Sequence, residues 1–212
     1  RIAEADITEN RFEEMLVDRD HVVLTLWNHR AGLNSRVLRQ SDLQYAAWSP
    51  IREYLYRPVS ANGRLLLRSS FNETTSIRDL TTGGLVWSVK GPQFVALAAN
   101  DAGTRFYVAW GHSLQVVDSI TGVTRWLASN VNPREVTVTG SRLYVSHGNS
   151  VSVFDAATDR PVYWTKAFSA EPLKPIIAGG VLYVTVPGDR VHVLDPVTGN
   201  PITTAASTGA TA

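Results

Sequence analysis

The chain has 212 residues, with 20 basic and 19 acidic side chains and a formal net charge of +1. A surface that binds nucleic acid needs a concentration of basic side chains to neutralise phosphates, so this near-balance predicts no nucleic-acid partner. The chain has no cysteine, which excludes disulfides, thiolate metal sites and cysteine nucleophiles, and no apolar run approaches the roughly 20 residues of a membrane-spanning helix.

The chain divides into a short lead, five repeated units and a tail. Residues 1–10 precede the first recognisable strand and are predicted to be a lead or a closing strand. The units follow in chain order as residues 11–50, 51–91, 92–131, 132–168 and 169–204. Residues 205–212 contain only Ala, Ser, Thr and Gly, a composition that predicts a flexible tail.

Each unit predicts four short strands, because runs of β-branched and aromatic residues alternate with turn residues. In the third unit these strands cover residues 93–99, 104–110, 113–119 and 123–129. No segment longer than one turn predicts a helix. A period of roughly 39 residues with four strands per period is typical of a propeller blade.

A motif recurs where the predicted third strand of each unit ends: Asp, then Gly four residues later, then Trp four residues after that. Two units carry it in full, as Asp79, Gly83, Trp87 and Asp118, Gly122, Trp126. The fourth unit has Asp155, then Asp159 in the Gly position and Tyr163 with Trp164 in the Trp position. The fifth has Asp195 and Gly199 but Thr203, and the first is the weakest copy, with Gln40, Gln44 and Trp48.

Turn geometry explains the residue types of this motif. The Asp carboxylate can accept hydrogen bonds from backbone N–H groups two or three residues ahead and so close the turn. The Gly takes the backbone through a conformation that is costly for other residues. The Trp then lies on the outermost strand, where its ring is expected to cover the neighbouring blade.

The motif resembles the tryptophan-docking motif of the quinoprotein-like, or PQQ-like, β-propeller repeat family, over residues 11–204. The resemblance implies an all-β propeller of about five four-stranded antiparallel blades, either a closed five-blade ring or part of a larger propeller. The enzymes of this family need eight blades, a calcium ligand set and usually a vicinal cysteine pair. The resemblance is therefore to the non-enzymatic branch of outer-membrane assembly and cell-surface propellers, and no cofactor or metal is predicted.

The predicted binding residues lie in loops placed on one face of the propeller. Three histidines occupy the turn after the second strand of their units, but these turns are on separate blades and too far apart to share one metal ion. Exposed loop side chains are the simpler interpretation. The candidate binding residues are His29, Phe71, Trp110, His112, His147, Asn149, Asp189 and Arg190.

A second set of candidates consists of carboxylates at the starts of the innermost strands. Glu14, Glu53 and Glu135 would serve as acid and base if the chain were a carbohydrate-active hydrolase working at the axial mouth. Arg and Lys residues lie close to them in sequence, so plain ion pairing around the channel is the competing interpretation.

The sequence therefore predicts a non-catalytic propeller that serves as a rigid protein–protein interaction or assembly platform, as a module of a longer protein. The expected partner is a protein, and a small-molecule ligand stays open. The resemblance favours an extracytoplasmic location, in the bacterial periplasm or at the cell surface. The alternative is the carbohydrate-active hydrolase.

Overall fold

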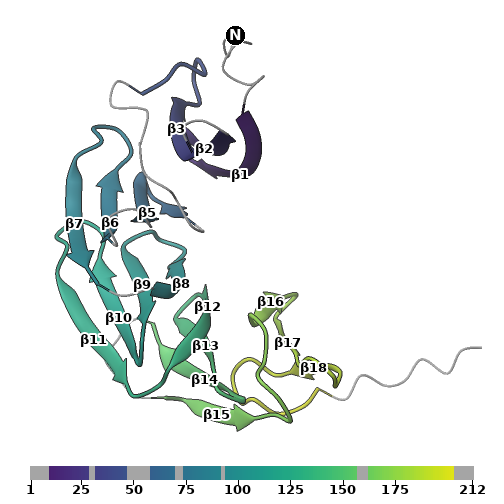
Figure 1. The fold of residues 1–212 in the computed structure, drawn as a ribbon. Coiled ribbons are helices and arrows are strands. Elements are labelled where there is room, and N and C mark those ends of the chain that lie inside the picture. Colours follow the sequence, from purple (N-terminus) through teal and green to yellow (C-terminus); the bar gives the residue numbers. More distant parts are fainter. Residues whose placement is uncertain are drawn as a thin grey trace, which may run out of the picture. The chain divides into compact units, whose positions relative to one another are not determined.

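The computed structural model describes residues 10–28, 32–46, 58–69, 74–91, 94–156 and 162–202. In these ranges the chain is all-β, with eighteen strands in five antiparallel sheets and no helix (Figure 1). This confirms the predicted fold class. A search of the same ranges for a helix long and apolar enough to cross a membrane finds none.

The sheets follow one another along the chain. The first contains β1 (Asn10–Asp18), β2 (His21–Asn28) and β3 (Gly32–Arg39). The second contains β4 (Val59–Ala61), β5 (Arg64–Ser69), β6 (Thr74–Asp79) and β7 (Leu85–Lys90), and the third β8 (Phe94–Ala99), β9 (Arg105–Trp110), β10 (Ser113–Asp118) and β11 (Thr124–Ser129). The fourth contains β12 (Pro133–Thr139), β13 (Arg142–His147), β14 (Ser150–Asp155) and β15 (Trp164–Ala167), and the fifth β16 (Ile176–Ala178), β17 (Val181–Thr185) and β18 (Val191–Leu194).

The chain forms two compact units, Arg1–Pro133 and Arg134–Ala212. The first unit holds the first three sheets, and the second holds nearly all of the last two. Within a sheet the strands pair in chain order, which is the meander of a propeller blade.

The third sheet shows how local sequence sets the register. Trp110 pairs with Ser113 across the two-residue turn formed by Gly111 and His112, and Gly111 has a φ of +52°. A two-residue hairpin needs positive φ in its loop, which glycine supplies without steric cost. The observed strands of this sheet begin and end within one residue of the predicted ones.

Each core cluster lies between two consecutive sheets. In the first unit, Val23 and Val37 of the first sheet pack with Leu65 and Leu67 of the second. On its other face the second sheet packs Leu66 and Ile77 with Phe106, Val108 and Val117 of the third. In the second unit, Tyr144, Val151 and Val153 pack with Leu182, Val184 and Leu194. Inner sheets thus bury both faces, since successive side chains of a strand point to opposite faces.

The first repeat differs from its predicted alignment by one residue. In the described turns of the second, third and fifth repeats, the N–H of the motif Asp bonds to the carbonyl five residues ahead, as Asp79 bonds to Gly84. In the first sheet Arg39 makes this bond, to Gln44, and the N–H of Leu43 bonds to the Arg39 carbonyl. The Asp and Gly positions are therefore filled by Arg39 and Leu43 rather than by Gln40 and Gln44.

The predicted lead 1–10, apart from Asn10, and the predicted tail 205–212 lie outside the described residues. So do Trp48, Asp159 and Thr203, which complete the imperfect copies of the motif.

Candidate functional site

The Asp turns are closed by paired backbone hydrogen bonds. The Asp118 Oδ1 accepts from the N–H groups of Ile120 at 3.0 Å and Thr121 at 2.7 Å. Asp79 Oδ1 accepts in the same way from Thr81 and Thr82, both at 2.8 Å, and Asp195 Oδ1 accepts from Val197 at 2.7 Å and Thr198 at 2.8 Å.

These bonds favour the charged carboxylate. Bonds from the backbone and the hydroxyl of Thr121 lower the pKa of Asp118, with partial desolvation opposing them. The backbone bonds of Thr198 and Val197 lower the pKa of Asp195. For Asp79, partial burial acts to raise the pKa, but the Thr82 bond and the Arg64 charge outweigh it and leave the pKa low.

Two motif glycines, Gly122 and Gly199, each contact the tryptophan of the preceding repeat. Gly122 has a φ of +70°, and a methyl group added there would lie 2.9 Å from the Val86 carbonyl oxygen and 3.2 Å from Trp87 Cβ. Gly199, with a φ of +73°, lies against the indole ring of Trp164, where an added methyl group would be 2.8 Å from Cδ2. In the fourth repeat the ring at this contact is thus Trp164.

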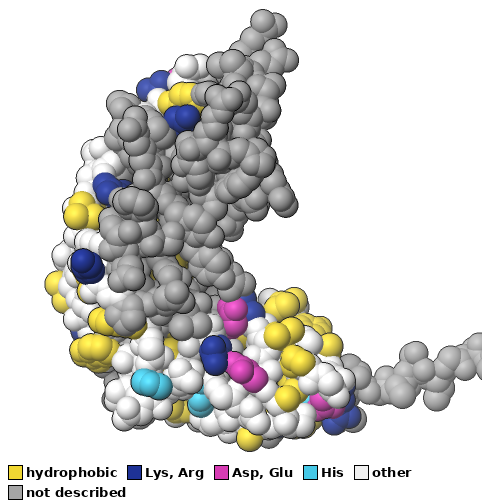
Figure 2. Space-filling model, in the orientation of Figure 1, with side chains coloured by type: hydrophobic (Ala, Val, Ile, Leu, Met, Phe, Trp, Pro, Cys, Tyr) yellow, Lys and Arg dark blue, Asp and Glu magenta, His cyan; other side chains and the backbone are white. Residues whose placement is uncertain are grey.

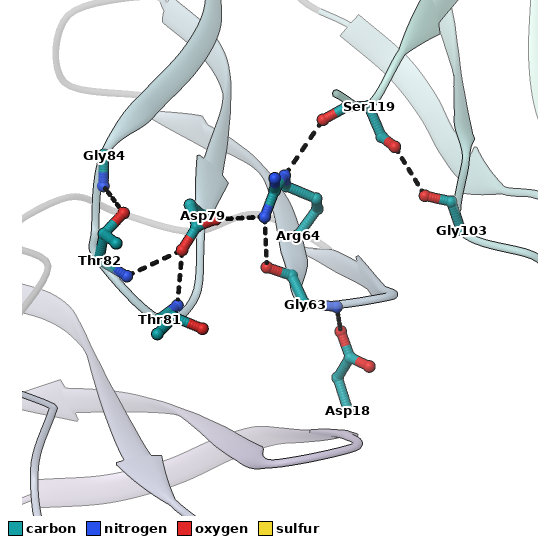
Figure 3. Close-up of polar contacts among 9 residues, drawn as sticks. All are labelled: Asp18, Gly63, Arg64, Asp79, Thr81, Thr82, Gly84, Gly103 and Ser119. Carbon is teal, nitrogen blue, oxygen red and sulfur yellow. Dashed lines mark hydrogen bonds and ion pairs between the residues drawn. The ribbon is translucent and has the colours of Figure 1, made fainter. Parts of the chain in front are cut away.

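Arg64 links the sheets of the first unit in a polar network (Figure 3). Its guanidinium forms an ion pair with Asp79 and donates to the Ser119 carbonyl of the third sheet at 3.2 Å. The neighbouring Gly63 N–H donates to Asp18 Oδ2 of the first sheet at 2.9 Å. Ser119 Oγ in turn donates to the Gly103 carbonyl at 2.7 Å. The bonds join consecutive sheets, so the network is a structural one.

Trp126 is more exposed to solvent than Trp87 and Trp164, which are half-buried. Its side chain is 61% exposed, and Ile120 and Val123 in the adjoining turn are also mostly exposed. One neighbour is Trp110, whose ring is stacked with it at a centroid distance of 6.4 Å and an interplanar angle of 28°. Ile120, Val123 and Trp126, the exposed apolar residues of this turn and of β11, are together called the outer apolar patch below.

The predicted loop residues lie in equivalent turns of their sheets. His112 and Asn149 are exposed in the β9–β10 and β13–β14 turns, and Asp189 and Arg190 are exposed between β17 and β18. His147 ends β13, half-buried, and burial lowers its pKa. His29 and Phe71 lie outside the described residues.

Two clusters contain catalytic residue types without the geometry of a catalytic site. His147 Nε2 lies 2.6 Å from Ser152 Oγ, but Ser152 is only 3% exposed, so a substrate could not reach it. Asp189 Oδ2 lies 3.0 Å from Ser169 Oγ and 3.2 Å from His192 Nε2. A catalytic triad needs the imidazole between the nucleophile and the acid, whereas here the carboxylate lies between the other two.

The carboxylates of the hydrolase alternative are only partly described. Glu135 is half-buried on β12. Glu171, close to it in the second unit, forms an ion pair with Arg134 at 3.1 Å, as the ion-pairing interpretation expects. Glu53 and the side chain of Glu14 lie outside the described residues. A search of the described residues for three or more His, Cys, Asp or Glu side chains able to hold a metal ion finds no such group.

Five consecutive sheets, each with its strands paired in chain order, define a β-propeller fold, and the described Asp turns and two Gly–Trp contacts resemble those of the PQQ-like repeat. The family model described as outer membrane protein assembly factor BamB matches residues 128–205, which hold the fourth and fifth repeats. This match supports the resemblance on which the sequence prediction rests. No curated protein matches the chain.

Solved structures agree on the fold. BamB from Moraxella catarrhalis is 16% identical with a TM-score of 0.61, and the alignment covers 88% of this chain and 62% of that one. Saccharomyces cerevisiae Sqt1 is 8% identical with a TM-score of 0.66, covering 91% and 61%. The computationally designed protein Ika8 is 12% identical with a TM-score of 0.65, covering 91% and 73%. At these identities the likeness shows the fold alone, and the chain spans less than two thirds of the BamB and Sqt1 chains.

Sequence reasoning missed the outer apolar patch, because Trp126 was assigned only a structural role. One signal was present: the repeat after Trp126 has Asp159, not glycine, in the position that contacts the ring elsewhere. It also missed Arg64, although an arginine opens the second strand of three consecutive repeats, as Arg64, Arg105 and Arg142.

Proposed function

We propose that this protein is a non-catalytic β-propeller that serves as a rigid interaction or assembly platform for another protein, as a module of a longer protein. The observation that carries the proposal is the exposed Trp126 in the outer apolar patch. In two other repeats the equivalent ring lies against a glycine of the next repeat, whereas most of Trp126 faces solvent. Exposed aromatic residues in apolar patches are typical of protein interfaces.

The scaffold suits this role. The Asp118 turn that carries Ile120 and Val123 is held by backbone hydrogen bonds on one side and by the close contact of Gly122 with β7 on the other. Trp126 itself is stacked with Trp110. A preordered patch loses little side-chain entropy on binding, which favours affinity.

No specific observation among the described residues favours the hydrolase alternative: of its three carboxylates, Glu14, Glu53 and Glu135, only Glu135 has a described side chain. The exposed residues His112, Asn149 and Arg190 remain candidates for a second contact region, because turns on a rigid propeller often carry binding residues.

Site-specific photo-crosslinking in the native host tests the proposal. A photoreactive amino acid at position 126 should give one discrete adduct, and the same group at Thr139, exposed in the second unit, should not give that adduct. Replacing Ile120 and Val123 by serine should weaken the adduct from position 126. Absence of an adduct, or glycoside hydrolysis by the purified protein that Glu135→Gln abolishes, would contradict a binding platform.

A further inference from the structure

The outer strands β7 and β11 both present hydrophobic side chains at the surface (Figure 2), but they pair differently with the strand beside them. In β7 a register shift precedes Trp87, which pairs with Ile77. In β11 the shift follows Trp126, which pairs with Gln115. Gln115 and Ser76 each lie three residues before the motif Asp, so Gln115 is the equivalent of Ser76 and not of Ile77. The two tryptophans therefore point to opposite faces of their sheets, because a slip of one residue moves a side chain to the other face.

The observed register places Trp126 on the face of the third sheet that packs on the second sheet. Its partner Gln115 also pairs with Val108, which belongs to the core cluster between these two sheets. Directly opposite residues of neighbouring strands lie on one face. Trp110, two residues after Val108, shares this face, and its ring stacks with Trp126. Gly91 of the second repeat lies against Trp110, since an added methyl group there would be 3.0 Å from the Cζ2 atom.

The two outer strands differ only over a short stretch. At their starts and at their ends β7 and β11 pair with equivalent residues of β6 and β10. The residue left unpaired by the shift is Val86 in β7 and Leu127 in β11. A bulge inserts one extra residue and leaves the ladder on both sides in place. Moving the bulge of β11 from Leu127 to Arg125, the equivalent of Val86, would therefore change the pairing of Arg125, Trp126 and Leu127 alone.

We propose that β11 exchanges between these two registers and thereby presents or withdraws Trp126. In the second register Arg125 is the bulged residue and Trp126 pairs with Val116, as Trp87 pairs with Ile77 in β7. Trp126 then leaves its stacked partner and turns to the opposite face of the third sheet. The exchange is a property of the chain alone, and only its effect on partner binding rests on the proposed function.

Each register keeps one apolar contact that the other gives up. The observed register keeps the stack of Trp126 on Trp110, and aromatic pairs contribute beyond the area that they bury. The second register gives Trp126 the strand position in which Trp87 is half-buried, and it moves Leu127 opposite Gln115, onto the apolar face towards the second sheet. Opposing contacts of this kind favour a small free-energy difference, which a two-state element requires.

Fluorine NMR of the purified full chain, labelled with 5-fluorotryptophan, tests the exchange. The Trp126 signal is assigned by its loss in Trp126→Phe. Relaxation dispersion or a second signal should show exchange of Trp126 on the microsecond-to-millisecond timescale, whereas Trp87, whose register is fixed by its contact with Gly122, should show none. Trp110→Ala removes the stacked ring and should raise the population of the second register, relative to the first, about 2- to 10-fold.

Two aspartate variants distinguish a change of register from rotation of the Trp126 ring. Leu127→Asp should abolish the exchange, since in the second register its carboxylate would enter the apolar face towards the second sheet. Ser129→Asp is the matched control: Ser129 is exposed and pairs with Ser113 in both registers, so this variant should exchange like the unmodified chain. The Trp87 signal reports in each spectrum that the second and third sheets remain packed.

Two results would overturn the exchange. One is a Trp126 signal without exchange both in the unmodified chain and in Trp110→Ala. The other is exchange that persists in Leu127→Asp. Because the purified chain is measured without a partner, neither result depends on the proposed function, which the adduct at position 126 tests separately.

Discussion

Two structural constraints select glycine at the motif position of Gly199: a positive φ and a close contact with a tryptophan ring. Gly199 has a φ of +73° and touches the Trp164 ring, whereas Gly180 in the same sheet has a φ of +74° with nothing within 4 Å of an added methyl group. Any L-residue with a side chain is strained at such a φ. Only at Gly199 would a side chain also displace a packed ring.

Gly199→Ala should therefore destabilise the protein more than Gly180→Ala. The backbone strain common to both is about 1–2 kcal/mol, and overpacking against Trp164 should add about 1–3 kcal/mol at Gly199. Urea unfolding followed by circular dichroism measures both. Equal losses of stability would show that the ring contact contributes nothing.

The turn carboxylates predict acid sensitivity with a definite sign. The pKa of Asp118 is lower in the folded chain than in the unfolded chain. Its contribution to stability is therefore complete above the unfolded value of about 3.9 and is lost as the pH falls through the lower folded value.

Asp118→Asn should reduce the fall in unfolding free energy between about pH 5 and pH 2, because asparagine does not titrate there. Asp79 and Asp195, whose pKa values are also lowered, remain in this variant, so part of the pH dependence of the unfolding free energy should persist. Unfolding curves at several pH values check this. An unchanged slope would mean that Asp118 has the same pKa in both states.

At the scale of the structural element, the outer strands β7, β11 and β15 each carry a tryptophan at an equivalent position, but the three rings differ in how they are packed. Trp87 and Trp164 lie against glycines of the next repeat, while Trp126 on β11 is mostly exposed. The same residue type therefore stabilises the fold on two strands and is available to a partner on the third.

Trp164→Ala should cost about 2–4 kcal/mol, near the lower end for aromatic truncation because the ring is only half-buried. Trp126→Ala should cost less than about 1 kcal/mol. Thermal unfolding of both variants measures the difference. A loss for Trp126→Ala as large as that for Trp164→Ala would show that the exposed ring has a structural role.

For the whole molecule, the number of covered faces per sheet sets local stability. In β13 and β14 four consecutive residues are buried, because both faces of the fourth sheet are covered. In β17 buried and half-buried residues alternate, since one face is open.

Amide hydrogen exchange should follow this difference. Peptides covering β13 and β14 should exchange more slowly than those covering β17 and β18, because strands with both faces covered open less often. Equal protection at low concentration would contradict the dependence on covered faces.

The repeat and its turns could be read from the sequence because they are local. Asp118, Gly122 and the two-residue turn at Gly111 each act within a few residues, so spacing alone placed them correctly. The first repeat was placed one residue too far along because Leu43 adopts a φ of +54° without a glycine to mark it. The exposure of Trp126 depends on contacts with other repeats, which the spacing of its own repeat cannot show.

The sequence by itself determined an all-β propeller of about five repeats, since hydrophobic periodicity and turn chemistry are local properties of the chain. Tertiary structure decided which faces and rings are covered. Tyr144 and Tyr183 occupy the same strand position, yet one is buried against the next sheet and the other lies on an open face. The physical reason is that burial depends on the neighbouring sheet, and that neighbour is specified by packing across the fold rather than by the strand's own residues.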